Sequence, residues 1–326
     1  MEFGVTDCAG LQAYVMDPDP EKEVSVNRTL LSRAVRAVEA LSPNLRFVVL
    51  PTGTKAYGVH LLRDGFPFPR DLPLRETLPR IPEPHASRMF YYGQCDEMAD
   101  MARGKRWGWC EVVPDVVVGF VPNNNAYSLA QWLGLYLSLV REMEGEGAEV
   151  VFPGTKASWA ALSNDASQDV LARAAIATSL RLGRERGGER FNVADCARPR
   201  AWRDKWPVVC AYFGLRGTGP PEEGHGPDPA DVLAGDAARG REVEEKYGLV
   251  TGRAGNERSF GGFVSVPFFL IPTPPLFLFF SLSFVYLFLI PCLALLILSC
   301  LEGLTGLRRD VPLLTMLAAR VHHADV

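Results

Sequence analysis

Short apolar runs alternate with longer helical stretches along most of this sequence, and that alternation constrains the fold more than any other feature. The runs expected to be strands are short and rich in β-branched or aromatic residues, and they occupy 47–50, 107–113, 116–120, 148–152 and 191–193. Helices are expected over 27–41, 94–103, 129–140, 165–180, 202–213 and 239–247. Because strands that alternate with helices favour a parallel sheet covered by helices, the sequence predicts an α/β fold.

The last part of the chain, residues 259–326, differs in kind from the rest. No charged residue stands between Arg258 and Glu302, and the segment 276–300 is long enough to cross a bilayer as a helix. Three interpretations stay open: a single transmembrane helix, a buried core segment, or translated intron sequence, whose pyrimidine-rich codons would produce the bias to Phe, Leu, Ser and Pro. The first predicts a single-pass membrane protein, and the other two are compatible with a cytoplasmic one.

Charge and cysteine usage narrow the functional classes. With 34 basic and 38 acidic side chains, the chain shows no basic excess of the kind that a nucleic-acid partner requires. The seven cysteines form no C-x-x-C pair, and the five histidines show no metal-ligand spacing with them. The start, 1–4, has no basic-then-apolar signal pattern. We therefore expect no nucleic-acid partner, no disulfide framework and no metal site, and a reducing, cytoplasmic compartment.

A lysine follows the end of the strand at 47–50. The strand breaks into the turn Thr52-Gly53-Thr54, and Lys55 comes next. In an open α/β sheet, ligands bind outside the carboxyl ends of the strands, so Lys55 is expected at the edge where chemistry is done. On this stretch alone, a plain turn followed by a solvated surface lysine stays the alternative.

A tyrosine about thirty-six residues further on changes that balance. Reduction of a carbonyl or enone requires a bound hydride donor and an acid that stabilises the developing oxyanion. A tyrosine can be that acid if a nearby ammonium group stabilises its phenolate. Lys55 and Tyr91 form such a pair if the strand end and the segment 90–92 meet in space. The spacing Y-x-x-x-K is absent, since Cys95 stands four residues after Tyr91 and the lysine precedes the tyrosine.

This order resembles the progesterone 5β-reductase/iridoid synthase-like (PRISE-like) branch of the extended short-chain dehydrogenases, within the NAD-dependent epimerase/dehydratase superfamily. That branch carries a T-G-x-K-x-Y segment and a later F-Y-Y segment, which are 52–57 and 90–92 here. Residues 109–122 resemble its W-x-x-x-R-P … G-F-x-P stretch, with Val113 in place of the arginine. Further similar segments are 152–155, 158–159 and 191–195, so that the resemblance covers roughly residues 11–250.

The resemblance implies a Rossmann-like parallel sheet, NADP(H) as cofactor, and a small hydrophobic enone or carbonyl as substrate. Residue by residue, it implies Lys55 and Tyr91 as the catalytic pair. Tyr91 would hydrogen-bond the substrate oxygen as hydride arrives, and Lys55 would lower the pKa of Tyr91 and hold the nicotinamide ribose. The positions implied to line the cofactor are Thr52, Lys55, Tyr91, Val117, Asn124 and Asn125.

The resemblance also divides the chain. Residues 1–125 would be a partial Rossmann-like cofactor region, 126–258 a smaller substrate-side region interleaved with the end of the sheet, and 259–326 the apolar C-terminal tail. Tyr92 is expected in the core or pocket wall rather than as a second acid, and Tyr57 is a weaker pocket candidate. The proline-rich stretch 64–86 is expected to be a long surface or active-site loop.

The opening of a dinucleotide fold is missing from the sequence. Such a fold begins with a strand, a glycine-rich turn and a helix, whose backbone amides hold the pyrophosphate. No G-x-G-x-x-G occurs near the start, so the sequence predicts a sheet that lacks its first βαβ half and the pyrophosphate-binding loop. The first hypothesis is an NADP-dependent oxidoreductase, and whether it is active without that half of the cofactor site stays open. A non-catalytic Rossmann-like protein that binds a nucleotide or a partner, and a membrane-anchored relative, are the alternatives.

Overall fold

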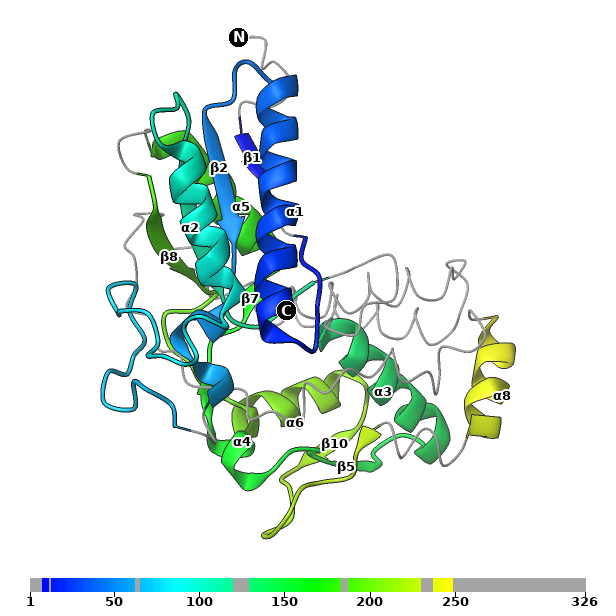
Figure 1. The fold of residues 1–326 in the computed structure, drawn as a ribbon. Coiled ribbons are helices and arrows are strands. Elements are labelled where there is room, and N and C mark those ends of the chain that lie inside the picture. Colours follow the sequence, from blue (N-terminus) through cyan, green and yellow to red (C-terminus); the bar gives the residue numbers. More distant parts are fainter. Residues whose placement is uncertain are drawn as a thin grey trace. The chain divides into compact units, whose positions relative to one another are not determined.

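The computed structural model describes residues 8–11, 13–61, 65–119, 129–182, 187–229 and 237–248 (Figure 1). These residues belong to two compact units, which are described separately. The first comprises the described residues up to Val116 together with Asn164–Arg198. The second comprises Val117–Ser163 and the described residues from Pro199 onward.

A four-stranded sheet forms the centre of the first unit. In spatial order its strands are β1 (Cys8–Gly10), β2 (Phe47–Pro51), β3 (Gly108–Pro114) and β8 (Glu189–Val193). All three strand pairs are parallel, and their register places Leu50 opposite Glu111 and Glu111 opposite Arg190. The α/β fold with a parallel sheet is therefore confirmed. β1 was not predicted, because its three small residues form no apolar run.

Helices cover both faces of this sheet. α1 (Pro20–Leu41) and α2 (Phe90–Ala102) lie side by side on one face, and α5 (Gln168–Arg181) lies on the other (Figure 1). Alternate strand residues serve the two faces: Leu50 joins the core cluster shared with α1 and α2, whereas the Cys110 thiol hydrogen-bonds Thr178 of α5. Because both faces of the sheet are covered, the sequence of β2 is an uninterrupted apolar run.

Both helices on the first face begin earlier than the sequence pattern predicts. α1 starts at Pro20 rather than at residue 27, because the Asp19 carboxylate accepts hydrogen bonds from the backbone amides of Glu21 and Lys22. α2 starts at Phe90 rather than at residue 94, with no side-chain cap to announce it. The earlier start has a functional consequence, since it places Tyr91 and Tyr92 in the first turn of a helix.

The proline-rich stretch has the irregular backbone that was expected, and three of its apolar side chains are buried. It follows two short 3-10 turns, η1 (Thr54–Tyr57) and η2 (Val59–Leu61). Within the stretch, Phe68, Leu74 and Ile81 are buried and pack in one cluster with residues of η1 and α2. The stretch is therefore a largely exposed loop that these three buried side chains anchor to the core of the first unit.

The remaining elements are short or belong to the second unit. In the first unit, β7 (Ala166–Ser167) immediately precedes α5. In the second unit the elements are β4 (Val117–Val118), α3 (Leu129–Glu144), β5 (Glu149–Val151), α4 (Lys156–Ala160), β6 (Leu162–Ser163), β9 (Arg200–Ala201), α6 (Trp202–Tyr212), β10 (Arg216–Thr218) and α8 (Ala237–Tyr247). β5 and β10 pair in parallel, and β6 and β9 pair antiparallel.

The apolar segment 276–300 lies outside the described residues, and so does the expectation of a transmembrane helix there. Of the helices that the structure describes, none is both long enough and apolar enough to span a membrane.

Asn27 is a fully buried polar residue in α1, and it fixes the segment that leads into the helix. Its side-chain oxygen accepts the Val15 amide at 2.8 Å, and its side-chain nitrogen donates to the Val15 carbonyl at 2.7 Å and the Glu23 carbonyl at 2.8 Å. Asn27→Ala should lower the free energy of unfolding by about 1–3 kcal/mol, because these backbone groups lose their partner.

Urea unfolding followed by circular dichroism measures this loss. The matched control is Thr29→Ala, which removes an exposed hydrogen bond to the Ser25 carbonyl of the same helix. The control should change the free energy of unfolding by less than about 0.5 kcal/mol. Equal effects of the two substitutions would contradict the assignment of Asn27 as an anchor.

Candidate active site

The turn after β2 continues the sheet and then bends into η1. The Thr52 amide donates to the Val112 carbonyl at 2.9 Å, which extends the pairing of β2 with β3. Gly53 has extended backbone, and Lys55 is exposed in η1. This turn stands at the carboxyl end of a parallel strand, which is the edge where open α/β sheets bind ligands.

Tyr91 reaches this turn from α2. A Cβ atom added to Gly53 would lie 3.1 Å from the Tyr91 hydroxyl oxygen, so the hydroxyl rests against the bare backbone of Gly53. The Phe90 ring flanks that of Tyr91, with centroids 4.3 Å apart. Within the part of the chain that the structure describes, the Tyr91 hydroxyl makes no hydrogen bond. The strand end and the tyrosine segment therefore meet, and the phenol is available to a ligand.

The surroundings of Tyr91 keep its hydroxyl protonated. Burial raises the pKa of Tyr91 well above its ordinary value, and the nearby Tyr14, Glu23 and Glu111 raise it further. These groups act in the direction opposite to that of an activating ammonium group. The lowering of the Tyr91 pKa by Lys55, which the resemblance to the family implies, stays a prediction.

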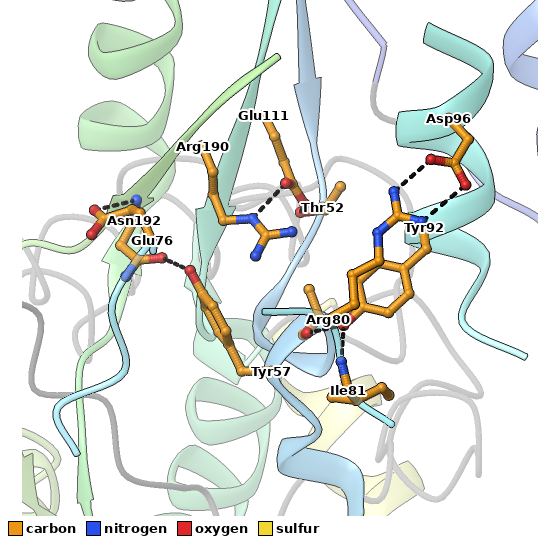
Figure 2. Close-up of polar contacts among 11 residues, drawn as sticks. Thr52, Tyr57, Glu76, Arg80, Ile81, Tyr92, Asp96, Glu111, Arg190 and Asn192 are labelled. Atoms are coloured by element: carbon orange, nitrogen blue, oxygen red, sulfur yellow. Dashed lines mark hydrogen bonds and ion pairs between the residues drawn. The ribbon is translucent and has the colours of Figure 1, made fainter. Parts of the chain in front are cut away.

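A buried ion pair lies beneath the turn (Figure 2). Glu111 of β3 is 3% exposed, and its Oε2 accepts Arg190 Nε from the neighbouring strand β8 at 2.6 Å. Its Oε1 accepts the Thr52 hydroxyl at 2.7 Å. The Thr54 hydroxyl likewise donates to Asp115, just beyond β3, at 3.1 Å. Both hydroxyls of the Thr-Gly-Thr turn are therefore tied to carboxylates of the adjacent strand and its end.

Tyr57 ties η1 to β8, and its partner Asn192 ties β8 to the proline-rich stretch. The Tyr57 hydroxyl donates to Asn192 Oδ1 at 2.6 Å, and the Arg190 guanidinium lies over its ring, 5.3 Å from the centroid. Asn192 in turn donates from its backbone to Glu76 and from its side chain to the Leu74 carbonyl. Tyr57 is fully buried, and burial raises its pKa. Its hydroxyl is thus committed to a structural contact.

Tyr92 is the second tether, and its predicted place in the core is confirmed. Its hydroxyl donates to the Ala56 carbonyl at 2.5 Å and accepts the Ile81 amide at 2.9 Å (Figure 2). The Arg80 guanidinium lies over its ring at 4.8 Å and pairs with Asp96. One side chain therefore joins α2, η1 and the proline-rich stretch.

Tyr14 is a further aromatic residue near the site. It lies between β1 and α1, its ring stacks on Phe90 at 5.5 Å, and 43% of its surface is exposed. The backbone of the next residue, Val15, is fixed by Asn27. The signal in the sequence that points to Tyr14 is its place as an aromatic residue just before the turn 17–20.

The other predicted cofactor positions belong to the second unit or lie outside the described residues. Val117 belongs to β4 of the second unit, and Asn124 and Asn125 lie outside the described residues. Their relation to Thr52 therefore stays a prediction. Sequence reasoning also missed Glu111 and Arg190, although a charged residue inside an otherwise apolar strand is a recognisable signal. Among the described residues, no group of three histidine, cysteine, aspartate or glutamate side chains could hold a metal ion.

Comparison with known proteins identifies the family. The sequence model of the PRISE-like Rossmann-fold domain matches residues 4–273. The chain belongs to this family. This PRISE-like chain is 42% identical over 189 residues to the short chain dehydrogenase ausT of Aspergillus calidoustus. The aligned region covers 58% of the chain and 46% of the relative. It is 29% identical over 192 residues to 3-oxo-Delta(4,5)-steroid 5-beta-reductase of Arabidopsis thaliana, which covers 58% and 46%.

The PRISE-like chain thus spans about half the length of these curated relatives. A solved structure, that of RMD from Pseudomonas aeruginosa complexed with NADPH, is similar with a TM-score of 0.50. The similarity extends over 68% of this chain and 72% of that one at 12% identity, so it shows the fold alone.

The two neighbouring tyrosines of α2 should respond differently to loss of the hydroxyl. Tyr92→Phe removes bonds to Ala56 and Ile81 inside the core, so it should lower the free energy of unfolding by about 1–3 kcal/mol. Tyr91→Phe removes no hydrogen bond between described residues and should cost less than about 0.5 kcal/mol. Urea unfolding of both variants measures the difference, and a loss at Tyr91 as large as that at Tyr92 would contradict it.

Proposed function

We propose that this protein is an NADP-dependent oxidoreductase of the short-chain dehydrogenase type, which reduces an enone or carbonyl group of a small hydrophobic metabolite. One observation carries the proposal: the Tyr91 hydroxyl rests unbonded against Gly53, in the turn that bears Thr52 and Lys55. The names of the relatives, a short chain dehydrogenase and a 3-oxo-Delta(4,5)-steroid reductase, support the reaction type and the enone class of substrate.

The residues at this turn suit the nicotinamide end of a dinucleotide. Gly53 has no Cβ, so the Tyr91 hydroxyl can lie directly against the backbone of the turn that follows the strand. The exposed ammonium group of Lys55 and the hydroxyl of Thr52 are groups that can hold ribose or carboxamide. When bound, the cofactor supplies the hydride. The chain's own residues orient it and stabilise the oxygen of the substrate.

Tyr91 donates the hydrogen bond that the reaction needs. As hydride reaches the substrate, negative charge develops on the carbonyl oxygen, and a donor aimed at that oxygen lowers the barrier. Burial raises the pKa of Tyr91, so its hydroxyl stays protonated and can donate a hydrogen bond to the substrate oxygen. The positive charge of Lys55 then stabilises the phenolate side of the proton transfer.

The unpaired cysteines support a reducing, cytoplasmic location. All five cysteines among the described residues, Cys8, Cys95, Cys110, Cys196 and Cys210, are free thiols. Proteins of reducing compartments keep their cysteines in this form.

A non-catalytic nucleotide-binding protein is the second candidate. The observation in its favour is Val113, which stands where the related branch carries an arginine. This side chain is 2% exposed within the apolar cluster of the first unit, so no guanidinium group is present at that position.

The activity test follows NADPH oxidation by the purified full chain with a panel of cyclic and acyclic enones. Turnover with an apolar enone is expected, and Tyr91→Phe should lower kcat by roughly 10²–10⁴-fold, the range of a positioned acid. Lys55→Met should lower kcat as well, while the exposed and unrelated Lys156→Met should leave it unchanged.

Two outcomes would decide against the proposal. Full activity of the Tyr91→Phe variant would remove the site assignment. Binding of NADPH without turnover across the panel would favour the non-catalytic candidate instead.

A further inference from the structure

The hydrogen bonds around Glu111 have fixed directions. A carboxylate offers only acceptors and a guanidinium only donors, so Arg190 must donate to Oε2. The Thr52 hydroxyl must then donate its one proton to Oε1. Whatever else contacts the Thr52 oxygen meets lone pairs only. The ion pair therefore makes Thr52 a pure hydrogen-bond acceptor towards any ligand at the turn.

We propose that Glu111 and Arg190 are positioning residues that hold Thr52 as an acceptor for a donor group of the cofactor. This inference rests on the proposed function and deepens it. The donor groups of a nicotinamide dinucleotide near its reactive ring are the ribose hydroxyls and the carboxamide N–H₂. Glu111 bonds both the Thr52 hydroxyl and Arg190, so the pair would act on the cofactor through Thr52 (Figure 2).

The register of the sheet fixes this arrangement. Glu111 and Arg190 are directly opposed on adjacent parallel strands. On the other side Glu111 is opposed to Leu50, and Thr52 stands two residues after Leu50. All three side chains therefore share one face of the sheet, since alternate strand residues point to the same side. At 3% exposure, the Glu111 carboxylate is shielded from solvent that could replace Thr52 or Arg190 as its partner.

A single substitution reverses the direction of these bonds with little change of shape. In Glu111→Gln the amide oxygen must face Arg190, which can only donate, so the amide N–H₂ faces Thr52. The Thr52 oxygen then accepts that bond, and its proton turns outward. Thr52 would then present one proton and one remaining lone pair to the ligand instead of two lone pairs, so the binding of a ligand donor would weaken.

The decisive experiment is a double-mutant cycle on the full chain, with NADPH binding measured by its fluorescence. Glu111→Gln and Thr52→Val should each raise the Kd by about 10-fold, which corresponds to about 1.4 kcal/mol. If Glu111 acts through Thr52, the double variant should bind no more than about 2-fold more weakly than Thr52→Val alone. Thr52→Ser keeps the hydroxyl and should restore most of the affinity.

The matched control is Glu149→Gln. Glu149 and Arg216 are also register-opposed on parallel strands, β5 and β10, but both are exposed and belong to the second unit. The control should bind NADPH with wild-type affinity. A thermal melt of every variant separates loss of binding from loss of folding, and steady-state kinetics should show the effect in KM for NADPH rather than in kcat.

Each outcome is decisive. Wild-type affinity in Glu111→Gln, or effects of the two substitutions that multiply to about 100-fold, would overturn the positioning role. If Glu111→Gln does not fold, Thr52→Val keeps the ion pair intact, and wild-type affinity in that variant would overturn the proposal. If the wild-type chain binds no NADPH, the proposed function fails and the positioning role falls with it, a result distinct from binding that is insensitive to Glu111.

Discussion

The buried pair of Glu111 and Arg190 is the constraint on which the site depends. Removing two charges from water costs several kcal/mol per ion, so the carboxylate tolerates its burial only when both oxygens are bonded. Those bonds run to β8 on one side and to the turn after β2 on the other. The three adjacent strands β2, β3 and β8 are thereby tied together, and the turn after β2 is fixed where Tyr91 contacts it.

Three tyrosines surround this centre, and their environments give them different roles. The Tyr57 hydroxyl donates a hydrogen bond to Asn192, and the Tyr92 hydroxyl forms hydrogen bonds with two backbone groups. Only the Tyr91 hydroxyl is without a hydrogen bond among the described residues. Tyr57 joins η1 to β8, and Tyr92 joins α2 to η1 and to Ile81 of the proline-rich stretch, so both hydroxyls have structural roles. A tyrosine is thus either a structural contact or a candidate acid, depending on the hydrogen-bond partners of its hydroxyl.

The sequence predicted the fold well where the signal was local. Apolar runs located β2, β3 and β8, and helical periodicity located α1, α2 and α5, because each pattern depends on neighbouring residues only. The start of α1 was missed, since Asp19 announces it through a cap outside the periodic stretch. The juxtaposition of Tyr91 with the turn was predicted from the order of motifs, through a resemblance to a known family rather than from the pattern itself.

Features that depend on register or tertiary packing could not be predicted in this way. The pairing of Glu111 with Arg190 joins residues that are 79 positions apart, and no local pattern brings them together. The proline-rich stretch looked like a surface loop because its apolar residues show no period, yet Leu74 and Ile81 are buried. Burial has the largest effect on the pKa of each tyrosine at the site and raises it. Glu111 raises these pKa values further, and Arg190 lowers those of Tyr57 and Tyr92. At Tyr91 burial and acidic neighbours prevail, so this phenol stays a proton donor until a substrate oxygen takes on charge beside it.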